Sequence, residues 1–160
     1  IELWGAEQLS PADLDYVRTF QPMIEIPLGD EAKLLCFHGS PRSDRDVIVP
    51  ATPEKDLERM LRGFQATVMI GGHTHTQMFR RYGDAILMNP GSVGLPIERD
   101  LATGRMRNPP WAEYAVVTRE GEALGVELRR VPVDVEAICR AALDSGMPHV
   151  EWWLEGWGRG

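Results

Sequence analysis

The stretch ATVMIGGHTH, residues 66–75, determines how the surrounding chain can fold. Its β-rich first half, residues 66–70, predicts a short strand that ends at two glycines. Residues 32–37, AKLLCF, predict a second strand that is apolar enough to be buried on both faces, and His38 follows it directly. The segment between them predicts a helix that is capped by Thr52 and opened by Pro53, because its apolar residues form one stripe. These apolar residues are Leu57, Met60, Leu61 and Phe64. Strand, helix, strand is a βαβ pattern, which predicts an α/β fold whose sheet is covered by helices.

Two antiparallel hairpins are predicted after this unit. Residues 77–81 and 85–88 flank a Tyr-Gly-Asp turn, and residues 113–118 and 123–131 flank a Glu-Gly turn. Residues 98–110, which lie between the hairpins, are polar and rich in Gly and Pro, and predict a surface loop. The second half of the chain therefore supplies antiparallel strands to the fold.

The N-terminal segment predicts a helix followed by an edge of the sheet. Residues 9–20 carry a full helix-start signal, with Ser10 as the N-cap, Pro11 in the first turn and Asp13 completing a capping box. Residues 24–28 alternate as a half-buried strand does, and the turn after them is assigned to Gly29-Asp30.

The C-terminal segment predicts a last helix over residues 135–145, capped by Asp134. The tail that follows contains Trp152, Trp153 and Trp157, and we expect it to pack on the body of the protein. No repeat or linker divides the chain, so residues 1–160 are interpreted as a single domain.

Composition excludes several classes of function. The 160 residues carry 17 Lys+Arg against 24 Asp+Glu, a net charge of -7, which argues against bulk binding of duplex nucleic acid. No apolar run approaches the roughly 20 residues that span a bilayer, and the first residues show no signal-peptide pattern. Cys36 and Cys139 are the only cysteines. One disulfide between them is the alternative to the interpretation we favour, two buried free thiols in a cytoplasmic protein.

Three of the four histidines stand at predicted strand ends, in Gly-rich junctions. The carboxyl ends of strands are where open α/β sheets bind ligands. If the backbone of the H-x-H pair is extended, His73 and His75 face one side and can reach one metal ion or two adjacent ions. The alternative for the pair is a surface or core position without metal, and for His38 a satisfied histidine at a strand end. Together they favour a metal site, and imidazole suits Zn, Mn, Fe or Ni.

Two further features lie near these histidines. Residues 89–94, NPGSVG, predict a tight turn at the end of the 85–88 strand. Arg42 follows the His38 turn, and its guanidinium could pair with a substrate phosphate, although a plain surface arginine is the alternative. Asp44 and Asp46, in the same loop, are further candidate ligands, but acidic loop residues are usually only solvated.

The order HGSP (38–41), GHTH (72–75) and NPGS (89–92) resembles the second half of a calcineurin-like metallophosphoesterase, most closely the small bacterial and archaeal phosphodiesterase-type branch. The resemblance runs from about residue 9 to residue 96. It implies a metallophosphoesterase-type β-sandwich of mixed sheets flanked by helices, with two metal ions about 3.5–4 Å apart. It also implies that His38 and His73 ligate one ion and His75 the other, and that a hydroxide bridging the ions attacks phosphorus.

The family's N-terminal motifs, Asp-x-His, Gly-Asp and Gly-Asn-His, are not present in the sequence. Three histidines are too few to hold two ions. We therefore expect residues 1–160 to be the second half of a metallophosphoesterase domain whose N-terminal half is missing. The function that follows is a dinuclear metal-dependent phosphodiesterase or phosphatase acting on a small-molecule or nucleotide phosphate ester. The alternative is an inactive phosphoesterase-like scaffold that binds a protein partner.

Overall fold

The computed structural model describes residues 1–29, 31–101 and 103–158, so Asp30 of the predicted turn lies outside the described part of the chain. The chain divides into two compact units. The first consists of Ile1–Gln21, Glu98–Pro110 and Pro132–Gly160. The second consists of Pro22–Ile97 and Trp111–Val131, and it contains all three strand-end histidines.

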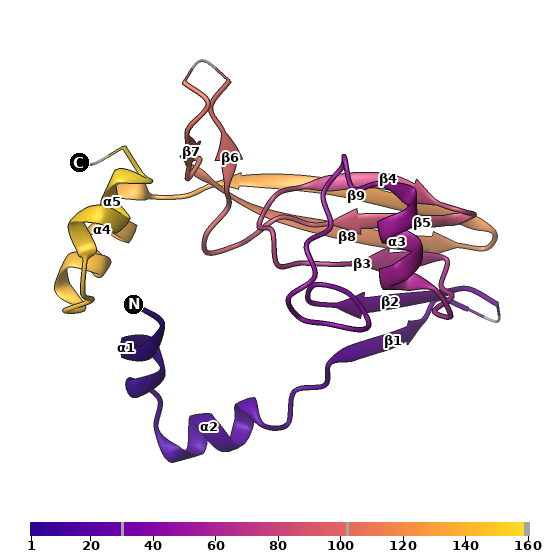
Figure 1. Ribbon diagram of the computed structural model, residues 1–160, viewed down its shortest axis with the longest axis horizontal. Helices are drawn as coiled ribbons and strands as arrows, with labels where there is room; N and C mark the ends of the chain where they lie inside the picture. Colours follow the sequence, from indigo (N-terminus) through magenta and orange to yellow (C-terminus); the bar gives the residue numbers. More distant parts are fainter. Residues whose placement is uncertain (30, 102, 159–160) are drawn as a thin grey trace. The chain divides into compact units, whose positions relative to one another are not determined.

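The second unit is built on a five-stranded mixed sheet with the order β1-β2-β3-β5-β4 (Figure 1). Strands β2, β3 and β5 are parallel and central, while β1 and β4 pair antiparallel at the two edges. The strands are β1 (Met23–Pro27), β2 (Lys33–Phe37), β3 (Val68–Ile70), β4 (Met78–Tyr82) and β5 (Ala85–Asn89). The predicted βαβ unit and first hairpin are thus confirmed.

Helix α3 (Glu54–Leu61) covers one face of this sheet. Leu57, Met60 and Leu61 of the predicted stripe are buried against the sheet, whereas the fourth member, Phe64, follows the end of the helix and packs partly buried against the same cluster. The predicted cap is wrong: the N-cap is Pro53, and the Thr52 hydroxyl instead accepts a hydrogen bond from the Val49 N–H at 2.8 Å in the preceding turn. The helix therefore begins without a side-chain cap.

A long hairpin, β8 (Trp111–Glu120) and β9 (Ala123–Pro132), packs on the opposite face of the sheet. Its apolar side chains contact Leu34, Val68 and Met88, which form a second buried cluster. Two sheets with a core between them, and a helix on the outer face, confirm the predicted α/β sandwich with mixed sheets and flanking helices.

Strand β1 differs from its prediction as a half-buried strand, because all five of its residues are exposed. Ile24 and Ile26 pair with Cys36 and Leu34, so they point to the same side of the sheet as the second cluster. They are nevertheless 53% and 45% exposed, since the two-stranded hairpin does not reach the edge of the five-stranded sheet. An apolar edge strand remains at the surface of this unit.

The first unit contains short helices and one small hairpin. Helix α2 (Pro11–Val17) begins with the predicted Ser10–Asp13 capping box but ends at Val17 rather than at residue 20. The Asp134 carboxylate caps α4 as predicted, accepting from the Ala137 N–H at 2.9 Å. The remaining elements are α1 (Glu2–Glu7), β6 (Glu98–Arg99), β7 (Met106–Arg107), α4 (Val135–Asp144) and α5 (Val150–Glu155).

Two expectations for this unit need correction. Residues 98–110 are not a plain loop, because β6 and β7 pair antiparallel within them. The tryptophan-rich tail packs only in part: Leu154 and Trp157 are buried, whereas Trp152 is 67% exposed.

Cys139 is buried and Cys36, in the other unit, is half-buried; both are free thiols. None of the helices in the described part of the chain is long and apolar enough to cross a membrane.

Candidate metal centre

The candidate site lies where the parallel strands β2, β3 and β5 end. His38 follows β2, the Gly71–His75 loop follows β3, and Asn89 is the last residue of β5. The Gly72 N–H donates to the His38 carbonyl oxygen at 2.6 Å, and the Gly71 N–H donates to the Met88 carbonyl oxygen at 2.9 Å. The three strand ends are therefore tied together by their backbones, at the edge of the sheet where such folds bind ligands.

His38 and His73 meet at this edge. The His38 Nε2 and His73 Nδ1 atoms are 3.1 Å apart, and the two rings are inclined at 66°. Two nitrogens bound to one ion at about 2.1 Å each are roughly 3.0–3.4 Å apart for tetrahedral or octahedral angles. The separation and the chemistry of the pair thus fit two ligands of a single ion. His38 is exposed, so the pair is open to solvent.

The H-x-H backbone is not extended, which corrects the geometric reason for expecting its two imidazoles on one side. His73 and His75 have φ angles of 65° and 55°, in the left-handed region. The Thr74 N–H donates to the Gly72 carbonyl oxygen at 2.7 Å, which makes His73 the centre of a γ-turn. Such turns with positive φ are strained, and strain of this kind clusters at functional sites.

Asn89 holds this strained loop in place. Its side chain is buried, and its amide Nδ2 donates to the Gly72 carbonyl oxygen at 2.6 Å and to the Thr74 hydroxyl at 3.0 Å. Its Oδ1 accepts from the Gly91 N–H at 2.9 Å. The Asn89 side chain therefore joins the GHTH loop, to which its amide nitrogen donates, to the NPGS loop, from which its amide oxygen accepts. The sequence predicted the second loop to be near the histidines but gave Asn89 no role of its own.

His75 is oriented separately from the other two histidines. Its Nδ1 lies 2.8 Å from the Leu95 carbonyl oxygen. Because a carbonyl only accepts, Nδ1 carries the hydrogen, and Nε2 of the neutral ring keeps its lone pair. The His75 carbonyl oxygen accepts from the Ile97 N–H at 3.0 Å. A histidine that binds a metal ion through one ring nitrogen usually donates a hydrogen bond from the other, often to a backbone carbonyl, and this bond fixes the orientation of the ring.

Glycine at position 39 permits a close approach in the His38 turn. A Cβ there would lie 2.6–2.8 Å from the carbonyl oxygens of Ser43, Asp44 and Asp46. Any larger residue would push the 43–46 segment away and shift His38. Steric crowding therefore explains why glycine follows this histidine.

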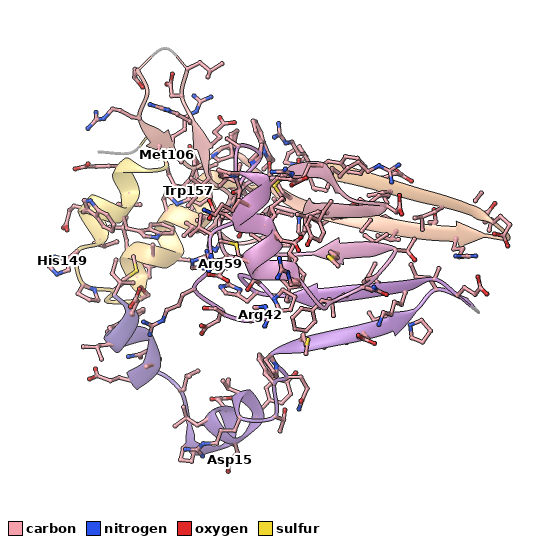
Figure 2. The ribbon with its side chains drawn as sticks, turned by 45° about the vertical axis from the view of Figure 1, so that its right-hand side comes forward. Asp15, Arg42, Arg59, Met106, His149 and Trp157 are labelled. Atoms are coloured by element: carbon pink, nitrogen blue, oxygen red, sulfur yellow. The ribbon has the colours of Figure 1, made fainter. Side chains whose placement is uncertain are left out.

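Arg42 and Asp46, the candidate substrate-binding and additional metal-binding residues, interact with neighbouring protein groups. Arg42 donates from Nη2 to the Arg62 carbonyl oxygen and its guanidinium lies 5.3 Å from the centre of the Phe64 ring, beside the end of α3 (Figure 2). Asp46 accepts from the Ser40 hydroxyl at 2.6 Å and is 4.0 Å from the guanidinium of Arg59, also labelled in Figure 2.

Within residues 1–29, 31–101 and 103–158, no three His, Cys, Asp or Glu side chains are grouped closely enough to hold a metal ion. The described residues therefore supply a fitting but partial donor set: a converging imidazole pair and a third, separately oriented imidazole.

A search of curated protein sequences found no match. Among solved structures, a metallophosphoesterase from Sphaerobacter thermophilus is 20% identical with a TM-score of 0.68, over 91% of this chain and 62% of that one. The hypothetical protein PH1004 from Pyrococcus horikoshii OT3 is 21% identical with a TM-score of 0.68, over 90% of this chain and 54% of that one. The chain thus spans less than two thirds of the length of either protein.

These two likenesses show the fold, and the sequence itself shows the family. The model of the calcineurin-like phosphoesterase superfamily domain matches residues 13–118, which is more than half of the chain and includes all three site histidines. The chain belongs to the calcineurin-like phosphoesterase superfamily.

Proposed function

We propose that this chain provides part of the active site of a metal-dependent phosphoesterase, a phosphodiesterase or a phosphatase. The observation that carries the proposal is the 3.1 Å separation of the His38 and His73 nitrogens at the strand ends. In the proposal this pair holds one divalent ion and Nε2 of His75 holds a second. Bound Zn, Mn, Fe or Ni ions would supply a water-derived nucleophile at neutral pH and positive charge beside the phosphate oxygens.

The chain's own residues orient these imidazoles and meet the substrate. Asn89 and the γ-turn fix the backbone at His73, and the Leu95 carbonyl fixes the tautomer of His75. Arg42 is proposed to bind a phosphate oxygen of the substrate, since a guanidinium has five N–H donors and the contact with Arg62 uses only one. Replacing Arg42 by Ala should then raise KM more than it lowers kcat.

The donors present do not complete a dinuclear centre, so we propose that the remaining ligands come from a segment outside these 160 residues. Two facts support this: the described residues contain no cluster of three ligands, and the chain matches 62% and 54% of the lengths of the two solved structures. In this proposal the 160 residues form one domain with that segment.

The test is metal content and hydrolysis of bis(4-nitrophenyl) phosphate and 4-nitrophenyl phosphate by the intact protein, with Mn, Zn, Fe and Ni supplied in turn. His73→Asn removes the imidazole while keeping a residue that tolerates positive φ. Its matched control is His149→Asn, since His149 also has positive φ, at 59°, but lies in the other unit. We expect His73→Asn to lower turnover by at least about 100-fold and His149→Asn to leave it unchanged.

A second candidate is an inactive phosphoesterase-like scaffold that binds a protein partner, and the lack of a three-ligand cluster among the described residues favours it. The same experiment separates the two. Metal-free intact protein without turnover on either ester supports the scaffold, whereas stoichiometric metal with turnover that depends on His73 supports the enzyme.

The substrate class proposed is a small-molecule or nucleotide phosphate ester. We also propose a cytoplasmic location, which the two free thiols support, since free cysteines are typical of reducing compartments.

A further inference from the structure

The β8–β9 hairpin carries a charged pair on its inner, core-facing side. Along both strands this side is apolar and packs on the five-stranded sheet through Ala115, Val117, Leu124, Val126 and Leu128. The same two-residue alternation brings Glu113 of β8 and Arg130 of β9 to the inner side at one end of the hairpin. Glu113 is only 4% exposed. A carboxylate in this position breaks the pattern of a packed core.

Only one of the two Glu113 carboxylate oxygens is hydrogen-bonded. Oε1 accepts from Arg130 Nε at 3.0 Å and from Trp111 Nε1 at 3.2 Å, while the Arg130 guanidinium lies 4.7 Å from the centre of the Trp111 ring. Oε2 is buried and has no hydrogen-bond partner among the described residues. Burying a half-satisfied carboxylate costs free energy, so core packing does not account for a glutamate here.

Glu113 lies directly against the NPGS loop of the candidate site. Its backbone N–H donates to the Ser92 carbonyl oxygen at 2.9 Å. A methyl group on Gly91 would overlap both Oε2 and Cβ of Glu113, and Gly91 has a φ of 87°. Gly91 and Glu113 therefore fit together as a pair, and the position of the NPGS loop depends on the Glu113 side chain that packs against it.

From this loop, hydrogen bonds lead to His75. The Leu95 N–H donates to the Ser92 hydroxyl at 3.0 Å, and the Leu95 carbonyl oxygen accepts from His75 Nδ1 at 2.8 Å. Gln77 adds a second tie between the loop and the hairpin, because its amide Nε2 donates to the carbonyl oxygens of Pro90, at 3.2 Å, and Arg129, at 3.1 Å. The hairpin and His75 are thus connected through Ser92 and Leu95.

We propose that Glu113 is a positioning residue for His75: anchored by Arg130 and Trp111, its buried side chain holds the 90–95 loop where the Leu95 carbonyl fixes the Nδ1–H tautomer of His75. This inference rests on the proposed function in one respect: it is there that the orientation of His75 directs Nε2 toward an ion. The hydrogen-bond path itself exists without any ion, so it can be tested separately.

The experiment records the tautomer of His75 by two-bond nitrogen–hydrogen NMR correlation in the intact protein, labelled with ¹⁵N and freed of metal by a chelator. In the unaltered protein the Nδ1–H form should predominate. Glu113→Ala should raise the Nε2–H form of His75 several-fold, because the loop that carries the Leu95 carbonyl is released. Glu113→Gln keeps the shape and the acceptor for Arg130, so it should restore the original tautomer. The matched control is Glu120→Gln, an exposed residue on the same strand.

A folded Glu113→Ala protein with an unchanged His75 tautomer would overturn the proposal. If Glu113→Ala fails to fold, Arg130→Met decides, because that side chain is 51% exposed and its removal leaves Glu113 with one donor fewer. An unchanged His75 in Arg130→Met then overturns the proposal, and a shift toward Nε2–H supports it. Failure of the proposed function looks different: the tautomer responds to Glu113, but the intact protein binds no metal and has no turnover.

Discussion

At the scale of single residues, the three site histidines do not play equivalent parts. His38 and His73 converge through their ring nitrogens, whereas His75 is fixed by the Leu95 carbonyl. The H-x-H spacing suggested a shared direction for an extended backbone, but the backbone at both histidines is left-handed. Positive φ at a residue other than Gly could not be inferred from the spacing, because it depends on tertiary hydrogen bonds such as those of Asn89.

Removing the histidines one at a time should therefore give two kinds of metal loss. His38→Ala and His73→Ala should weaken the same ion, while His75→Ala should weaken the other and leave a mononuclear site. In the proposed function, activity should fall by orders of magnitude in all three, because both ions would be needed for the nucleophile and for charge stabilisation. Metal content per chain and turnover are measured on the intact protein. Two retained ions with near-normal turnover in all three variants would make the histidines structural.

Replacing Asn89 by Ala should destabilise the loop that carries His73 and His75. The change leaves the partly buried Gly91 N–H without its acceptor and removes the two hydrogen bonds that Asn89 donates to the GHTH loop, for a cost of roughly 2 kcal/mol. Urea unfolding measures the cost, and faster hydrogen exchange at Thr74 and Gly91 locates it. Gln65→Ala removes an exposed amide from the same unit and should change stability by less than about 0.5 kcal/mol. Equal effects of the two changes would refute the role of Asn89.

At the scale of secondary-structure elements, the sequence predicts best where local signals and burial agree. The α3 stripe, the Ser10–Asp13 capping box and both long hairpins are confirmed, since each depends on spacing within a few residues. The N-cap of α3 is wrong, because the Thr52 hydroxyl is used by the Val49 turn, a competing local hydrogen bond. Glu113 was missed as well, although its place in the inner alternation with Ala115 and Val117 was a signal that could have been used.

A side-chain hydrogen bond joins α3 to β4, and its contribution to stability should depend on pH. The Tyr82 hydroxyl donates to Glu58 Oε2 at 3.0 Å. Tyr82→Phe should cost about 0.5–1 kcal/mol, which is below the range for a buried hydrogen bond to a charged group because Glu58 is accessible to solvent. Tyr16→Phe, on an exposed tyrosine of α2, is the control and should have no measurable effect.

Partial burial and then the Glu58 carboxylate raise the pKa of Tyr82 above its ordinary value of 10.0. A raised folded-state pKa gives a contribution that is complete below pH 10.0 and is lost as the pH rises through the folded value. The stability difference between the unaltered protein and Tyr82→Phe should therefore shrink above pH 10. Denaturant unfolding at pH 8 and at successive values above 10 measures this difference, and a difference that grows with alkaline pH would contradict the assignment.

At the scale of the whole molecule, the two layers of the sandwich in the second unit are unequal in width. Five strands face a hairpin of two, and the apolar side chains of β1 remain exposed at the edge. The sequence pattern could not predict this exposure, because alternation reports which residues share a face and not whether another layer covers that face.

The 160 residues produced alone should therefore aggregate or dimerise through this uncovered surface. Exposed, flat, apolar edge strands are pairing sites, and Ile24 and Ile26 lie on one here. Replacing both by Lys should increase the soluble fraction and shift the remaining oligomer toward monomer in light-scattering measurements. The matched control is Leu3→Lys with Phe20→Lys, two exposed apolar residues of the first unit. A monodisperse, cooperatively melting monomer of the unaltered 160 residues would refute this expectation.

The left-handed backbone at positions 73 and 75 also limits how the site can change in evolution. Glycine and asparagine accept this conformation at little cost, whereas valine or isoleucine does not. A descendant that gives up the proposed metal binding can keep the loop intact by acquiring Gly or Asn at either position. A β-branched residue there instead requires the loop to rebuild. The residue type at these two positions in divergent sequences would thus reveal whether the chemistry was lost from an intact loop or the loop itself was remodelled.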